Sequence, residues 1–341
     1  MKILTRKSAA KNLTWWVSSM ALLFLFAGCH KGMEIVPKLT VTTVASGLPA
    51  VMGIDVGNNG TMWVSQSGTA HNDGKVVVIN QKGQKYDAII NLPSFLNKNT
   101  GQLQGTVHIL LDGKTLNVLS GDDLFAVDIS HFKPGDTPID ATTLTPEHVA
   151  AFMYQSGYPD SHPYNLTKGP DGDLYIADAG ANAIVHRNGP GDFSVLANIP
   201  GVDNPTPVGP PQIQSVPTSV FWDGQNFLVT TLTGFPFPQG EARIYQVSLS
   251  GQVSIYQTGL STLVDLAEGI KSEHIVVQYT SSFDPATSFA PNSGSLLWVN
   301  GTNSDELLGG LNMPVDIKQV NNHTWYVTVM GDGSVIKISN N

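Results

Sequence analysis

The sequence predicts an all-β fold, a six-bladed β-propeller, and three observations support this. A unit of an apolar strand, a turn rich in Gly, Asn or Asp, and a second strand recurs six times. Equivalent positions lie about 46 to 59 residues apart, at Gly53, Thr106, Asn165, Ser219, Asp265 and Asp316. Only 13% of the residues are charged, and 34 Gly and 21 Pro imply many turns and few long helices. Six units of three or four strands at this period describe a propeller, because solenoid repeats are shorter and a sandwich does not repeat six times.

The chain begins with a segment typical of a secretory signal peptide. Basic residues precede an apolar stretch, 13–26, which is shorter than the roughly 20 residues that span a membrane. Cys29, the only cysteine of the sequence, follows Ala27 and Gly28, and this string resembles a bacterial lipobox. An ordinary secretion signal with an incidental cysteine is the alternative. We expect a lipoprotein signal peptide over 1–28, lipid attachment at Cys29, a tether over 29–38 and a single propeller domain over 39–341.

The predicted anchor limits where the protein is located, and its net charge limits which partners it binds. More than one acyl chain gives stable attachment to a membrane, and His30 after the cysteine favours the outer membrane of a Gram-negative bacterium, periplasmic or surface-facing. Loss of residues 1–28 removes four positive charges from a chain of formal net charge −9, which argues against nucleic acid as a partner. We expect a monomer that contacts the membrane through its lipid and binds an envelope protein or a small polar ligand.

The ends of the chain predict how the ring closes. The last unit ends after its third strand, at 336–339, whereas the strand-like segment 39–44 precedes the first unit and has no partner of its own. We expect this N-terminal strand to complete the last blade, because the pairing protects two open edges. Within the blades, Asn59-Gly60, Asp171-Gly172 and Asp223-Gly224 stand between apolar runs, as in tight hairpins.

One insertion, roughly 131–160, interrupts the period. It predicts a short helix with Thr145 as N-cap and Pro146 at the first helical position. Three apolar residues of this helix are expected to dock on the rim of the ring: Val149, Phe152 and Met153.

Several strings resemble the ScyD/ScyE family. They are Ser-His-Pro-Tyr-Asn-Leu at 161–166, Ile-Ala-Asp-Ala-Gly-Ala-Asn at 176–182, Val-Pro-Thr-Ser-Val at 216–220 and Leu-Thr-Gly-Phe-Pro-Phe-Pro-Gln-Gly at 232–240. The last is the most specific, because no generic propeller repeat requires it. The resemblance runs from about residue 43 to the C-terminus. It implies an exported six-bladed propeller, related in architecture to NHL and gluconolactonase-like propellers, without a settled biochemical activity.

Propeller geometry gathers the long loops on one face. Loops between second and third strands and links between blades lie at the same end, whereas the other end holds tight hairpins. Binding residues commonly lie on such loops, and tolerated surface insertions are the alternative. The candidate ligand-binding residues of this loop face are Asp178, Asn182, Phe235 and Phe237.

The inner strands begin at the same face, so their first residues are expected to ring the mouth of the central channel. This ring comprises Thr106, Asn165, Ser219, Asp265 and Asp316. Its oxygen atoms suit a polar ligand or Ca²⁺, and a merely wet, polar channel is the alternative. We expect no resident metal or cofactor, with Ca²⁺ in the channel as the exception considered.

The same register argues against one kind of enzyme. Gluconolactonase-type propellers take metal ligands from the position one residue earlier, where this chain has no carboxylate or carboxamide: Met52, Tyr164, Thr218, Val264 and Val315. A register one residue later is the alternative, and it would place Asp265 and Asp316 at those positions. The sequence also lacks His-Glu-x-x-His and Gly-x-Ser-x-Gly motifs. We therefore predict a non-catalytic ligand- or protein-binding or scaffold module of the cell envelope. An envelope enzyme, lactonase- or hydrolase-like and using the loop face and channel, is the alternative.

Overall fold

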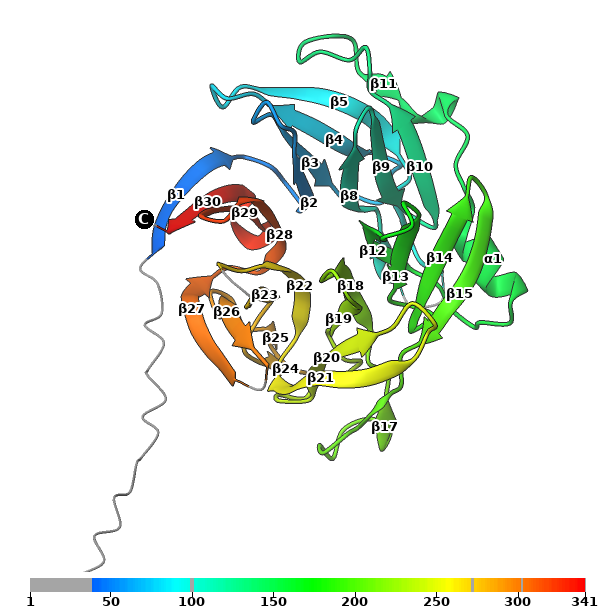
Figure 1. Ribbon diagram of the computed structural model, residues 1–341, viewed down its shortest axis with the longest axis vertical. Helices are drawn as coiled ribbons and strands as arrows, with labels where there is room; N and C mark the ends of the chain where they lie inside the picture. Colours follow the sequence, from blue (N-terminus) through cyan, green and yellow to red (C-terminus); the bar gives the residue numbers. More distant parts are fainter. Residues whose placement is uncertain (1–38, 99–100, 271–272, 302, 341) are drawn as a thin grey trace, which may run out of the picture. The chain divides into compact units, whose positions relative to one another are not determined.

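The computed structural model describes residues 39–98, 101–270, 273–301 and 303–340, and these form six blades around one axis (Figure 1). The predicted six-bladed β-propeller is confirmed. Each blade contributes its first strand to the wall of the central channel. These inner strands are β2 (Val51–Val56), β8 (Thr106–Asp112), β12 (Pro163–Lys168), β18 (Pro217–Trp222), β22 (Leu263–Glu268) and β28 (Pro314–Asn321).

The remaining strands of each blade follow outward in antiparallel order. Blade 1 continues with β3 (Met62–Gln66), β4 (Gly74–Ile79) and β5 (Lys85–Leu92), and blade 2 with β9 (Thr115–Ser120) and β10 (Asp123–Asp128). Blade 3 continues with β13 (Leu174–Asp178), β14 (Ala183–Gly189) and β15 (Asp192–Asn198), and blade 4 with β19 (Phe227–Thr231), β20 (Ala242–Val247) and β21 (Val253–Leu260). Blade 5 continues with β23 (His274–Gln278), β26 (Gly294–Asn300) and β27 (Asn303–Leu311), and blade 6 with β29 (Thr324–Val329) and β30 (Ser334–Asn340).

The N-terminal strand closes the ring as predicted. Strand β1 (Leu39–Ser46) pairs antiparallel with β30, from Leu39 opposite Asn340 to Ser46 opposite Ser334. Blade 6 therefore has four strands, in the order β1, β30, β29 and β28, and its outer strand comes from the opposite end of the chain.

The hairpins and the core explain why the repeats fold as blades. Gly60 and Gly224 turn the chain with φ of 74° and 97°, which residues with a Cβ rarely adopt. Side chains between neighbouring blades form the core, as in the cluster of Tyr175 with Phe227 and Tyr245. Trp325 is fully buried, and its Nε1 donates to the Glu268 carbonyl of the preceding blade at 2.9 Å.

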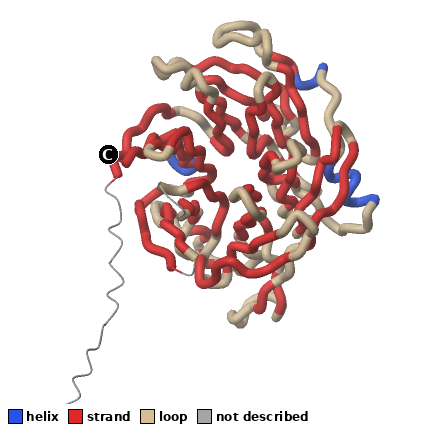
Figure 2. The backbone as a smooth tube through the Cα atoms, in the orientation of Figure 1, coloured by secondary structure: helices blue, strands red, loops and turns tan. Residues whose placement is uncertain are grey.

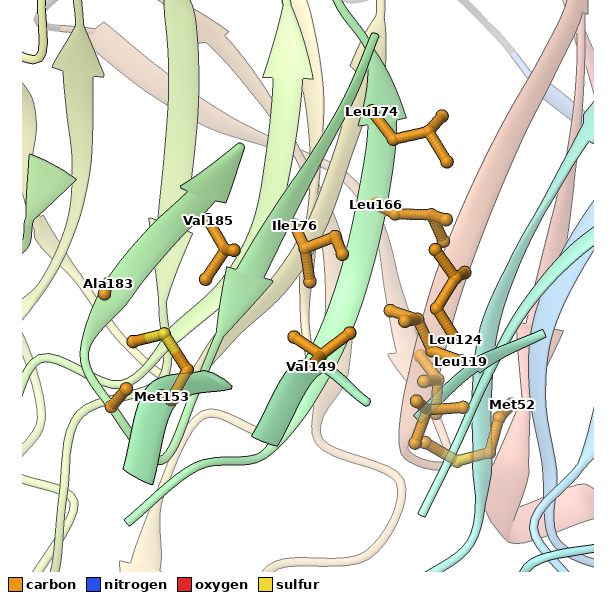
Figure 3. Close-up of a cluster of buried hydrophobic side chains, with 13 residues drawn as sticks. Met52, Leu119, Leu124, Val149, Met153, Leu166, Leu174, Ile176, Ala183 and Val185 are labelled. Atoms are coloured by element: carbon orange, nitrogen blue, oxygen red, sulfur yellow. The ribbon is translucent and has the colours of Figure 1, made fainter. Parts of the chain in front are cut away.

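The insertion takes the place of a fourth strand in blade 2. Its strand β11 (Ile139–Asp140) pairs in parallel with β5 of blade 1, and η1 (Ala141–Thr143) and α1 (Val149–Gln155) follow. The buried side chains of Val149 and Met153 join a cluster that includes Ile176 and Ala183 of blade 3 (Figure 3). Phe152 is partly buried, with its ring 5.8 Å from that of Phe193. The predicted docking of the helix is thus present.

The predicted start of this helix is wrong. The helix begins at Val149, and the preceding His148 makes no side-chain cap bond. Glu147 instead exchanges backbone hydrogen bonds with Leu124 of β10, at 2.8 and 2.9 Å, and its carboxylate binds Arg187 at 2.7 Å. These tertiary contacts outweigh the local preference of Thr145 and Pro146 for a helix start.

Long loops lie where the inner strands begin. Strands make up most of the ring (Figure 2). Three loops carry small ribbons: β6 (Phe95–Leu96) with β7 (Leu103–Gln104), β16 (Val202–Asp203) with β17 (Gln212–Ile213), and β24 (Phe283–Asp284) with β25 (Ser288–Phe289). A 3₁₀ turn, η2 (Met330–Asp332), links β29 to β30. Among the described residues, no helix has the length and apolar character needed to cross a membrane. Cys29, the signal peptide and the tether lie outside those residues.

Candidate functional site

One polar layer crosses the channel, with one residue from each inner strand. In four blades these residues are those expected: Asn165 lies opposite Ala177, and Ser219, Asp265 and Asp316 hold the same register in their blades. Gly53 holds the position in blade 1, where its amide donates to Ser65 Oγ at 2.7 Å. We call the layer of Gly53, His108, Asn165, Ser219, Asp265 and Asp316 the polar ring.

Thr106 does not belong to the polar ring, and His108 holds its place. Strand β8 changes register between Thr106, opposite Ser120, and Ile109, opposite Val118. The other inner strands have the same irregularity, for example between Pro163 and Asn165 and between Pro314 and Asp316. Thr106 therefore corresponds to the strand starts Pro163 and Pro314, and His108, two residues later, corresponds to the channel positions. Thr106 is fully buried instead, with its Oγ1 bonded to Ser120 Oγ at 2.9 Å.

The polar ring lies inside the channel rather than at its mouth on the loop face. His108, Asn165, Ser219, Asp265 and Asp316 line a cavity of about 210 Å³, which we call the channel cavity. The other lining residues follow them along the inner strands, toward the tight hairpins. The expected position at the loop-face mouth is therefore corrected.

The two carboxylates of the polar ring bind protein donors. Asp265 Oδ2 accepts the amide of Ile317 at 2.9 Å, and Asp316 Oδ2 accepts the amide of Ile54 at 2.6 Å. Both bonds join neighbouring blades, and the second crosses the closure between blades 6 and 1. The Asn165 side-chain amide also donates to Asp265 Oδ1 at 3.2 Å.

Burial governs the charges of the polar ring. It raises the pKa of Asp265 well above the ordinary value, and the neighbouring charge of Asp316 raises it further. Burial also raises the pKa of Asp316. It lowers the pKa of His108, so this imidazole is neutral at neutral pH.

A largely apolar layer lies next to the polar ring on its loop-face side, one residue earlier in each inner strand. Met52, Val107 and Val315 are buried in one cluster, and Val264 is buried in another. We call these residues, with Tyr164 and Thr218, the apolar layer. None of its six residues carries a carboxylate.

Beyond the apolar layer, a second hollow of about 380 Å³ lies among the long loops, and we call it the loop-face pocket. Tyr164, Thr218 and Val264 of the apolar layer line it. Its other walls combine apolar and polar side chains, among them Leu103, Val216, Leu232, Phe235, Phe237, Asp160, His162, Gln214 and Thr233.

The two predicted aromatic residues line this pocket but differ in burial. Phe235 is 49% exposed, whereas Phe237 is half-buried. The Phe237 ring centre lies 4.9 Å from those of both Phe283 and Phe289. Phe237 is therefore held by its neighbours, while Phe235 meets Phe237 and Phe283 edge-on, at 6.3 and 6.0 Å, and leaves about half of its surface exposed.

Two polar atoms of the loop-face pocket lack partners among the described residues. They are Nδ1 of His162 and Oγ1 of Thr233, both shielded from solvent. Burial lowers the pKa of His162 to about 4, so its ring is neutral at neutral pH. Neither residue was a sequence-level candidate, although both stand in the strings that resemble the ScyD/ScyE family.

The other two loop-face candidates hold the loops together. Asp178 is fully buried, and its carboxylate accepts from Ser161 Oγ, from the His162 amide at 2.7 Å and from the Ala181 amide at 2.9 Å. Asn182 accepts the amide of Val216 at 2.8 Å, which links blade 3 to blade 4. We therefore correct the prediction that these two side chains are presented to a ligand.

Comparisons with known proteins support the fold. No family model and no curated protein matches this sequence. A streptogramin B lyase matches at 12% identity over 89% of this chain and 98% of its own, with a TM-score of 0.53. A PQQ-bound aldose sugar dehydrogenase from Streptomyces coelicolor matches at 13% over 89% and 99%, with a TM-score of 0.58. A gluconolactonase from Xanthomonas campestris matches at 9% over 90% and 91%, with a TM-score of 0.59. These likenesses define the class, six-bladed propellers, and at such identities they show the fold alone.

Proposed function

We propose that this chain is a cell-envelope binding propeller of the ScyD/ScyE type, anchored through Cys29, which holds a small, partly apolar ligand in the loop-face pocket. One observation carries the proposal. The pocket combines an exposed aromatic ring, Phe235, with two unpaired and shielded polar atoms, His162 Nδ1 and Thr233 Oγ1. Apolar walls with a few convergent polar groups are the usual composition of a small-molecule site.

The chemistry of the walls defines the class of ligand. The rings of Phe235, Phe237 and Tyr164 favour a flat or apolar body, while a hydroxyl, amide or carbonyl group would satisfy Thr233 and His162. Asp160 is the carboxylate among the described lining residues, and it disfavours an anion. We therefore infer a neutral or cationic ligand.

The backbone of the pocket loop is set in advance of binding. Thr233 and Phe237 have φ of 74° and 55°, a conformation uncommon for residues with a Cβ. Pro236 and Pro238 restrict the segment further. Strain of this kind persists where the surrounding structure imposes it, often at ligand-binding sites, and a rigid loop loses less entropy on binding.

The pocket favours binding over catalysis. Hydrolysis of a lactone or ester needs a general base near neutral pKa or a bound metal. Burial holds the pKa of His162 near 4, which makes it a weak base at neutral pH. Asp160 has no second carboxylate beside it among the described lining residues.

A neutral aromatic dye tests the proposal directly. N-phenyl-1-naphthylamine fluoresces on leaving water, and we expect saturable binding of one dye per chain. Phe235→Ala should weaken the dye at least about 10-fold, because it removes the exposed ring, yet it should cost little stability. Phe237→Ala should lower the free energy of unfolding by about 1–3 kcal/mol, because its ring is half-buried against two others.

Ile255 supplies the matched control. It is 54% exposed on the outer strand β21, so Ile255→Ala removes an equally exposed apolar side chain away from the pocket. The dye should bind this variant as it binds the wild type. Dye binding that does not saturate, or that Phe235→Ala leaves unchanged, would place the ligand site elsewhere.

A further inference from the structure

His108 presents an unpaired ring nitrogen to the channel cavity. Its Nδ1 lies 2.8 Å from the carbonyl oxygen of Tyr164, which only accepts hydrogen bonds, so Nδ1 carries the proton. The neutral ring then has a lone pair on Nε2. This atom has no hydrogen-bond partner among the described residues, and the side chain is only 2% exposed. A buried lone pair that no protein group satisfies is available to a group bound in the channel cavity.

The lone pair lies beside two carboxylates. His108 Nε2 is 4.0 Å from Asp316 Oδ2, and the ligand atoms of His108, Asp265 and Asp316 lie within 4.8 Å of one another. Rotation of the side chains would have to shorten these separations, because each ligand atom lies about 2.0–2.2 Å from a bound Zn²⁺. The three residues come from blades 2, 5 and 6, so an ion among them would bridge the channel.

We propose that His108, Asp265 and Asp316 bind one divalent transition-metal ion, of which Zn²⁺ is the type, in the channel cavity. An imidazole nitrogen with carboxylate oxygens is a typical Zn²⁺ ligand set, whereas Ca²⁺ and Mg²⁺ prefer oxygen alone. Three protein ligands leave a position open to the cavity of about 210 Å³, where water or a small ligand can bind the ion.

Each proposed ligand is already oriented by a backbone group. The Tyr164 carbonyl fixes the tautomer of His108, in the manner usual for metal-binding histidines. The Ile317 and Ile54 amides hold Asp265 and Asp316 and leave lone pairs on both carboxylates. The ion would also offset the repulsion between two buried carboxylates.

A second cluster on the surface must be separated from this site. Asp171, Asp173 and His186 also place their ligand atoms within 4.8 Å of one another, but they are exposed or half-exposed. His186 Nε2 already contacts Asp173 at 3.0 Å, and its ring stacks on Tyr175 at 4.4 Å. These contacts satisfy its nitrogen. The surface cluster therefore serves as a control.

The experiment measures Zn²⁺ binding by equilibrium dialysis of the mature chain after treatment with EDTA. His186→Gln, which disables the surface cluster, should still bind one Zn²⁺ per chain and melt at a higher temperature with the metal. Adding His108→Gln should weaken Zn²⁺ at least about 10-fold, because lesser changes around a metal site already cost that much. Co²⁺ absorption in the visible should report a nitrogen ligand in the first protein and lose it in the second.

Several results would overturn the proposal. They are unchanged Zn²⁺ affinity after His108→Gln, loss of all binding with His186→Gln alone, or Ca²⁺ binding as tightly as Zn²⁺. Should His108→Gln fail to fold, Asp316→Asn takes its place, because its amide oxygen still accepts the Ile54 amide while the charge is lost. None of these results depends on the loop-face pocket, whose dye binding is measured separately.

Discussion

The apolar layer and the polar ring are built from adjacent residues of the same six strands, yet their chemistry is opposite. The apolar layer faces the loop-face pocket and consists of Met52, Val107, Tyr164, Thr218, Val264 and Val315. The polar ring lines the channel cavity with Gly53, His108, Asn165, Ser219, Asp265 and Asp316. A step of one residue therefore separates a space suited to a partly apolar ligand from a space suited to a cation.

The difference follows from the edges of the blades. Each inner strand is the last strand of its sheet, so its backbone groups on the channel side have no further strand to pair with. The polar ring supplies the missing partners, as Asp265 does for the Ile317 amide and Asp316 for the Ile54 amide. The polar side chains of the channel thus mainly stabilise the fold. His108 is the residue of the polar ring whose Nε2 has no hydrogen-bond partner among the described residues.

Tyr164 connects the two spaces. Its ring lines the loop-face pocket, while its carbonyl oxygen orients His108 in the channel cavity. The His108 and Tyr164 ring centres lie 4.8 Å apart. Tyr164 is therefore a shared wall of the two spaces.

The apolar layer and the polar ring both depend on closure of the propeller. Opening the propeller is therefore expected to have the largest effect on stability. Deletion of residues 39–44 removes most of β1 and exposes the edge of β30 in the blade whose inner strand carries Asp316. We expect the melting temperature to fall by about 10 °C or more, or the protein to aggregate, because an outer strand and its seam are lost. Thermal unfolding followed by circular dichroism measures this.

Deletion of residues 205–210, also six residues and lying in the loop between β16 and β17, controls for the loss of chain length. It should change the melting temperature by only a few degrees. If deletion of 39–44 has no larger effect than this, the last blade is stable with three strands, and the seam does not organise the channel.

The repeats made much of this fold predictable. Apolar runs around Asn59-Gly60 and Asp223-Gly224 located the blades, because such turns depend on local sequence alone. Segment 39–44 located the closure of the ring. The last blade lacks an outer strand and this segment lacks a partner, so pairing the two completes the propeller. Asp265 and Asp316 were found for the same reason: register within a regular repeat is a local property.

The channel position of blade 2 was missed because its copy of the repeat was aligned two residues early, at Thr106 instead of His108, although all six inner strands share one register irregularity. Other features depended on tertiary contacts that no local pattern reveals. Buried donors drew Asp178 inward, away from any ligand. His162 Nδ1 lacks a hydrogen-bond partner because of the residues that surround it in space, which the sequence does not reveal. The position of His162 in the string 161–166 was the one indication that the sequence offered.

The two spaces should respond differently to pH, which gives the second prediction. The pKa of His162 is lowered to about 4 in the folded chain, against about 6.5 when unfolded. The unfolded state therefore binds the proton first. The stability that His162 contributes is complete above pH 6.5 and is lost as the pH falls toward 4.

Urea unfolding at pH 7.5 and pH 5 measures this loss. The wild type should lose about 1–2 kcal/mol more than His162→Asn over that interval, because the variant has no ring to protonate. Other buried histidines, such as His108, affect both proteins alike, so the difference isolates His162. Equal losses in both proteins would mean that His162 titrates normally and that the loop-face pocket is wetter than the structure indicates.

The smallest effect on stability is predicted for the anchor. Cys29→Ser removes the proposed acylation site, ten residues before β1. We expect the variant to leave the membrane fraction while its melting temperature, its dye binding in the loop-face pocket and its Zn²⁺ affinity in the channel cavity stay unchanged. Fractionation of cell envelopes measures the release from the membrane, and Ser46→Ala, which keeps the cysteine, is the control that should remain with the membrane.

A Cys29→Ser protein that still sediments with membranes would show that attachment does not depend on the lipid. A released protein that loses dye or Zn²⁺ would show instead that the two spaces depend on the membrane and not on the blades alone.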